Sequence, residues 1–121
     1  MTIDDEMGEI VREFLIESFE NLDKLDRDFV ELEAEPTNPD LLGSVFRTLH
    51  TIKGTAGFFG FHKLERLAHV GENLLDSMRD GSKLLNEESA TVLLEMVDGI
   101  RALLERIEAA SDEGDLDFED L

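Results

Sequence analysis

Apolar residues recur at alternating steps of three and four positions in four separate stretches of this sequence. This spacing places them on one face of an α-helix, whereas a β-strand would need alternation at every second residue. No stretch sustains such a two-residue alternation of valine, isoleucine or threonine. The sequence therefore predicts four amphipathic helices, at about residues 5–35, 39–60, 62–80 and 87–110.

Residues that cap or stop helices separate these stretches. Asn38 is a predicted N-cap, and Pro39 fits the first position of the helix that follows it. Gly60 is the predicted end of this second helix. Gly81, in "RDGS", can adopt the left-handed conformation that closes the third helix, and Asn86 is the predicted N-cap of the fourth.

Short links of about three to six residues favour antiparallel packing of neighbouring helices. We therefore predict an all-α fold, an up-down-up-down four-helix bundle that forms one domain over residues 1–110. Residues 111–121 carry six acids and no base, which indicates a mobile acidic tail or the start of a linker. Its apolar residues would alternatively let it dock as a short fifth helix: Leu116, Phe118 and Leu121.

Composition excludes several classes of function. The chain has no cysteine, which excludes disulfides, zinc fingers and thiol catalysis and fits a reducing cytoplasm. No apolar run approaches the roughly 18 residues of a membrane span, and the acidic N-terminus is unlike a signal peptide. A formal charge of -19 argues against nucleic acid and against direct membrane contact. Residues 40–83, with five acids and six bases, are the part suited to a phosphate or an acidic pocket.

The second predicted helix contains "LHTIKGTAGFFGF", in which glycines interrupt a helical pattern. Glycine inside a helix costs about 1 kcal/mol relative to alanine, so a compensating role is expected. Arg47, Lys53, Gly54 and Gly57 share one side of the helix with His50, which lies at the edge of the apolar stripe. One hypothesis is that the glycines clear a landing surface for a partner protein around His50. The alternative is that they only allow close helix packing.

The third predicted helix brings acids and histidines to a matching face. In "HKLERLAHVGEN", steps of three or four join four residues of one face: His62, Glu65, His69 and Glu72. An antiparallel turn at Gly60 places position 50 opposite about 70 to 72, so we expect Glu72 to reach His50. The carboxylate would accept the Nδ1 proton and leave Nε2 free as a nucleophile, while Lys53 would offer a cation to phosphate oxygens.

Three other interpretations compete with this one. Glu72 and His69 could simply belong to a solvated, charge-paired helix face. A metal site of the Glu-x-x-His type would need ligands pointing into the core, where the stripes are apolar, so no metal is expected. The glycine series does not predict a nucleotide-binding loop, because the lysine precedes the first glycine and no strand comes before it.

The runs "HTIKGTAGFFGF" and "HVGENLL" closely resemble the histidine phosphotransfer domain at the N-terminus of chemotaxis kinases of the CheA family. The resemblance covers nearly the whole chain. It implies that His50, in the H-x-x-K-G motif, is the phosphoacceptor and that Lys53 is the motif's lysine. The family pattern H-x-x-E-N falls on His69, Glu72 and Asn73.

The resemblance also implies a phosphorelay in two-component signalling. A separate kinase domain, which binds ATP and magnesium, would phosphorylate His50, and the phosphoryl group would pass to receiver domains of the CheY and CheB type. The chain itself would be a phosphocarrier with no cofactor, cut from the N-terminus of a larger kinase or free-standing. The alternative function is a non-catalytic acidic bundle that serves as a protein-interaction module.

Overall fold

The computed structural model describes residues 3–81 and 85–110, with side chains from residue 8 onward. Four helices make up this part of the chain: α1 (Ile3–Ala34), α2 (Pro39–Phe59), α3 (His62–Arg79) and α4 (Glu87–Ala110). Each coincides within about two residues with a helix predicted from the apolar spacing. The predicted tail or fifth helix at residues 111–121 lies outside the described residues.

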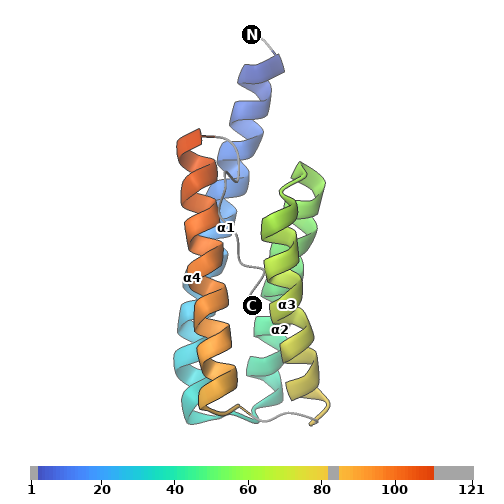
Figure 1. Cartoon of the computed structure of the whole chain (residues 1–121), viewed down its shortest axis with the longest axis vertical. Coiled ribbons are helices and arrows are strands. Elements are labelled where there is room, and N and C mark those ends of the chain that lie inside the picture. Colours follow the sequence, from blue (N-terminus) through green and yellow to red (C-terminus); the bar gives the residue numbers. More distant parts are fainter. Residues whose placement is uncertain (1–2, 82–84, 111–121) are drawn as a thin grey trace.

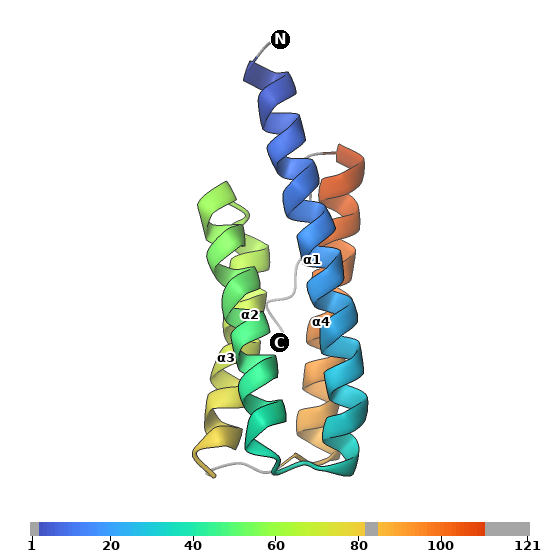
Figure 2. The same ribbon diagram turned by 180° about the vertical axis from the view of Figure 1, so that it is seen from behind.

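The helices run up and down in chain order and form a closed ring, in which α1 packs on α2, α2 on α3, α3 on α4 and α4 on α1. Figures 1 and 2 show α1 beside α4 and α2 beside α3, with the α2–α3 turn at the opposite end from the other two links. The N-terminal turns of α1 project beyond the ends of the other helices. The predicted up-down-up-down four-helix bundle is confirmed.

The caps predicted at both ends of α2 are present. The Asn38 side chain accepts hydrogen bonds from the backbone N–H groups of Asp40 (2.9 Å) and Leu41 (3.3 Å). At the other end Gly60 has φ 77°, a left-handed conformation that a residue with a side chain rarely adopts. Its N–H donates to the Gly57 carbonyl, and the Phe61 N–H donates to that of Ala56. These two bonds form a Schellman motif, which fixes where α2 ends.

The ends of the next link are capped as well. Gly81, with φ 82°, takes the left-handed conformation predicted for it. Asn86 and Ser89 cap the start of α4 reciprocally: the Ser89 N–H donates to Asn86 Oδ1 and the Asn86 N–H donates to Ser89 Oγ, both at 2.9 Å. The predicted N-cap at Asn86 is therefore confirmed, and the pair satisfies two backbone donors that a helix start leaves free.

The inward stripes of all four helices meet in one apolar core. Burying such side chains supplies the main favourable free energy of folding, about 25 cal/mol per Å² of apolar surface. No described helix carries an apolar stretch long enough to cross a membrane. The largest fully buried side chains come from every helix: Leu22, Leu25, Leu32, Leu49, Ile52, Leu64, Leu75, Met96, Ile100, Leu103, Leu104 and Ile107.

Close packing in this core leaves no free space for a side chain at position 71. A Cβ atom there would lie 2.9 Å from Leu49 Cδ1 and 2.9 Å from Met96 Sδ, both from buried residues on neighbouring helices. At Gly54, by contrast, a Cβ atom would meet nothing within 4 Å. Gly71 therefore serves the packing of the bundle, and Gly54 does not.

This difference predicts opposite effects of the same substitution. Gly54→Ala should raise the free energy of unfolding by up to about 1 kcal/mol, because alanine favours the helix and meets no neighbour. Gly71→Ala gains the same propensity but overpacks the core, at a cost of about 1 to 3 kcal/mol. Urea denaturation of both variants measures the difference. Equal stabilisation by the two substitutions would contradict the close contact at Gly71.

Candidate functional site

Helix α2 places His50 at the edge of the core. Its chain neighbour Leu49 is fully buried, whereas the His50 side chain keeps 65% of its surface exposed. Because successive helical residues are turned by about 100°, a residue next to a core position stands at the border of the apolar face. The imidazole is thus held at the surface by a backbone that the core fixes.

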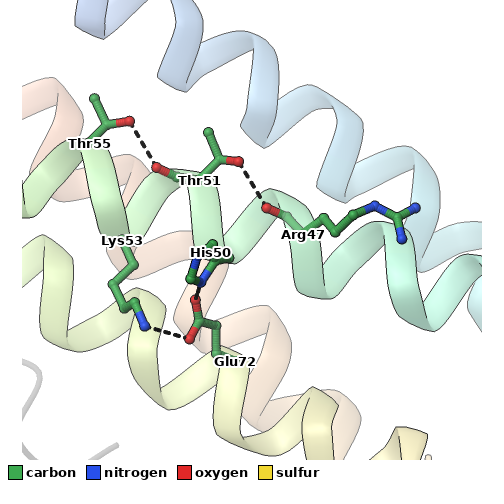
Figure 3. Close-up of polar contacts among 6 residues, drawn as sticks. All are labelled: Arg47, His50, Thr51, Lys53, Thr55 and Glu72. Carbon is green, nitrogen blue, oxygen red and sulfur yellow. Dashed lines mark hydrogen bonds and ion pairs between the residues drawn. The ribbon is translucent and has the colours of Figure 1, made fainter.

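The partner of His50 comes from α3. Glu72 Oε1 lies 2.8 Å from His50 Nδ1. Figure 3 shows this contact between α2 and α3. The Glu72 side chain is only 7% exposed. The register predicted from the turn at Gly60 is therefore confirmed, and the interpretation of Glu72 as a solvated surface residue is wrong.

This contact determines which nitrogen of His50 is free. A carboxylate only accepts hydrogen bonds, so the proton between the two groups belongs to Nδ1. A neutral imidazole then carries its lone pair on Nε2, on the other side of the ring from Glu72. With the ring largely exposed, Nε2 is available to a reactant that approaches from solvent.

Lys53 binds the second oxygen of the same carboxylate. Its Nζ lies 2.8 Å from Glu72 Oε2, and its side chain is 27% exposed. The sequence predicts that Lys53 serves incoming phosphate oxygens, but its pattern does not predict this ion pair with Glu72. The ammonium group offsets the cost of burying the Glu72 charge, and it has three donors, so the ion pair does not use them all.

His50 also has an aromatic neighbour on its own helix, and the spacing of the sequence places Phe46 next to it. The Phe46 ring lies one helical turn before His50, nearly parallel to the imidazole, with centroids 6.4 Å apart and planes 9° from parallel. The Arg79 guanidinium, from the last turn of α3, lies 4.6 Å from the centroid of the Phe46 ring. The i, i+4 spacing of Phe46 and His50 was a usable signal, but nothing in the sequence placed Arg79 over the ring.

The other predicted residues lie around this centre without completing it. Arg47 and Gly54 are exposed on α2, and open space surrounds Gly54. Gly57 instead faces α3, because a Cβ atom there would lie 2.5 Å from Glu65 Oε2. His69 is exposed, and within the described residues no hydrogen bond or ion pair joins it to His50, Lys53 or Glu72.

The described side chains that bear carboxylates and imidazoles nowhere gather in a group of three or more that could hold a metal ion. Every fully buried side-chain nitrogen and oxygen among them has a hydrogen-bond partner. The polar centre on α2 and α3 is thus a satisfied pairing of two cationic or basic groups with one carboxylate. Its chemical capacity rests on the exposed nitrogen of His50.

Comparison with protein families identifies this arrangement. Residues 9–110 match the family model described as the Hpt domain. Chemotaxis protein CheA of Halobacterium salinarum is 37% identical over 106 residues, which are 88% of this chain and 16% of that protein. The chain therefore spans less than a fifth of this relative.

Solved structures agree with the sequence match. The CheA phosphotransferase domain from Thermotoga maritima superposes with a TM-score of 0.80 at 33% identity, covering 83% of this chain and 95% of that one. The phosphorylated P1 domain of CheA3 from R. sphaeroides, solved in complex with CheY6, gives 0.78 at 29% identity over 86% of this chain and 81% of that one. The chain belongs to the Hpt domain family and is homologous to the P1 phosphotransfer domains of CheA proteins.

Proposed function

We propose that His50 is the residue that carries the phosphoryl group in this Hpt domain. It accepts the group on Nε2 from ATP held by a separate kinase domain and passes it to an aspartate of a receiver-domain protein. The observation that supports this most directly is the 2.8 Å contact of His50 Nδ1 with the buried Glu72, which leaves the exposed Nε2 as the basic nitrogen.

The chemistry follows from that protonation pattern. The Nε2 lone pair forms a bond to the γ-phosphorus while the bond from phosphorus to the leaving oxygen of ADP breaks. The imidazole ring gains positive charge, which the Glu72 carboxylate stabilises through the Nδ1 proton. In the second transfer an aspartate oxygen bonds to phosphorus, the N–P bond breaks, and Nε2 regains its lone pair.

Lys53 and Glu72 have distinct parts in this proposal. Glu72 holds the imidazole in one tautomer and one orientation, as the aspartate of a Ser-His-Asp catalytic triad does for its histidine. Lys53 pairs with the buried carboxylate and can direct remaining donors to phosphate oxygens at the surface. His69 is retained from the family pattern as a further candidate, on the exposed face of α3.

The ATP site and the receiver aspartate belong, in this proposal, to other domains and proteins. The chain spans 16% of Chemotaxis protein CheA from Halobacterium salinarum, and its glycines do not follow the order of a phosphate-binding loop. We therefore assign ATP and magnesium to a kinase domain of a larger CheA-type protein that acts in the cytoplasm. The structural relative in complex with CheY6 supports a receiver of the CheY type as phosphoryl acceptor, and the family resemblance adds the CheB type.

A non-catalytic acidic bundle is the alternative, and phosphorylation distinguishes the two. Incubation with ATP and a CheA-type kinase domain should label the chain on His50 alone, with phosphate that is labile in acid and stable in base. His50→Gln should abolish the label and leave the helical circular dichroism unchanged, because the side chain is exposed. Label that persists on His62 or His69 in this variant would refute the assignment.

The orienting role of Glu72 predicts a kinetic defect without loss of the fold. Glu72→Gln should slow phosphorylation of His50 by roughly ten- to a thousandfold, the range for removing an orienting or acid–base partner. The ¹⁵N chemical shifts of His50 should also lose the pattern of a ring protonated on Nδ1. Glu65→Gln is the matched control, since Glu65 contacts His62 instead. Equal rates in both variants would show that Glu72 does not serve the reaction.

A further inference from the structure

Phe58 is the most exposed large apolar side chain among the described residues, with 83% of its surface accessible. A single exposed apolar residue is ordinary on a protein surface, so exposure alone indicates nothing. Its position is what distinguishes it, because Phe58 lies on the helix that carries the phosphoacceptor His50.

Phe58 and His50 belong to one continuous strip of α2. A separation of eight residues corresponds to about 12 Å along the helix axis. Gly54 lies halfway between them, turned by about 40° from each, and open space surrounds it. A protein surface that covers both His50 and Phe58 therefore meets no side chain at the midpoint.

The threonine hydroxyls of this strip need no hydrogen-bond acceptor from a partner. The hydroxyl of Thr51 donates to the Arg47 carbonyl at 3.0 Å, and that of Thr55 donates to the Thr51 carbonyl at 2.8 Å. Because these donors are used within the helix, a partner can cover them without leaving a hydroxyl proton unpaired.

The Phe58 ring has an aromatic neighbour within the chain. It packs edge-on against Phe59, with centroids 5.2 Å apart. Phe59 in turn contacts Phe14 at 5.0 Å and Phe61 at 6.1 Å. Phe58 thus extends a cluster of aromatic rings to the surface, and aromatic residues, Phe included, are enriched in the cores of protein interfaces.

Charge along α2 favours a partner with an acidic surface. No acid occurs from residue 41 to residue 64, although the whole chain carries a formal charge of -19. The same segment contains Arg47, Lys53 and Lys63. Lys53 is paired with Glu72 and Lys63 lies on α3, so Arg47 is the base that adds positive charge beside the strip. The strip itself carries no acid on an otherwise acidic domain, which suits a pocket that presents a carboxylate to His50.

We propose that Phe58 is the apolar anchor by which this domain binds its receiver, with Gly54 as the gap across which the receiver reaches His50. The inference rests on the proposed function. It favours the receiver over the kinase domain, because a kinase domain in the same parent protein is present at millimolar effective concentration. A receiver is a separate protein, so its binding depends on the affinity that contacts with this strip of α2 provide.

The test compares Phe58→Ala with Val30→Ala in the full 121-residue chain. Val30 is 70% exposed on α1 and serves as the matched control for loss of an exposed apolar side chain. Each variant is first phosphorylated by a CheA-type kinase domain and then mixed with increasing concentrations of the CheY-type receiver to which the wild-type chain transfers fastest. Thermal melts of both variants verify that the fold is intact.

Phe58→Ala should raise the receiver concentration for half-maximal transfer at least tenfold and leave the kinase labelling rate within twofold, whereas Val30→Ala should change neither. Phe58→Tyr, which keeps the ring, should restore most of the loss. Unchanged transfer by Phe58→Ala, or equal losses in labelling and transfer, would overturn the anchor. Absence of label on wild-type His50 would refute the proposed function instead, and labelled His50 that transfers to no receiver would refute both.

Discussion

A carboxylate taken out of water must be paired, because an isolated buried charge costs several kcal/mol. In this bundle Glu72 is that carboxylate, and each of its oxygens has one partner on the neighbouring helix, His50 Nδ1 and Lys53 Nζ, both at 2.8 Å. The pairing links α2 to α3 and fixes the imidazole at the same time. The buried carboxylate whose charge must be paired is therefore also the group that fixes the tautomer and orientation of His50.

The geometry of that pairing depends on where α2 stops. The Schellman motif at Gly60 sets the first residue of α3, so the antiparallel register brings position 72 opposite positions 50 and 53. Gly71 then lets α3 approach Leu49 and Met96 closely at the level of Glu72. Two glycines thus act on the site from a distance, one through conformation and the other through its small size.

Much of this arrangement could be predicted from sequence. The spacing of apolar residues and the caps at Asn38, Gly60 and Asn86 determine the helices and their antiparallel order, and the order determines that Glu72 faces His50. These are local signals combined with one turn position. Side-chain contacts across a helix interface are harder to predict from sequence. The flexible side chain of Lys53 has several rotamers, and only the packed structure selects the one bound to Glu72.

The same limit explains the aromatic contacts. Arg79 and Phe46 meet only because α3 continues past the level of His50, so their stacking depends on tertiary packing and not on spacing within one helix. The surroundings of the glycines also depend on tertiary packing, since Gly71 is packed, Gly57 faces Glu65 and Gly54 is open. Whether Gly54 and Gly57 clear a surface for a partner stays a prediction. α1 and α4 supply core side chains to the bundle, while the described contacts of His50 come from α2 and α3. Substitution of the core side chains of α1 and α4 is therefore expected to lower stability without removing a described contact of His50.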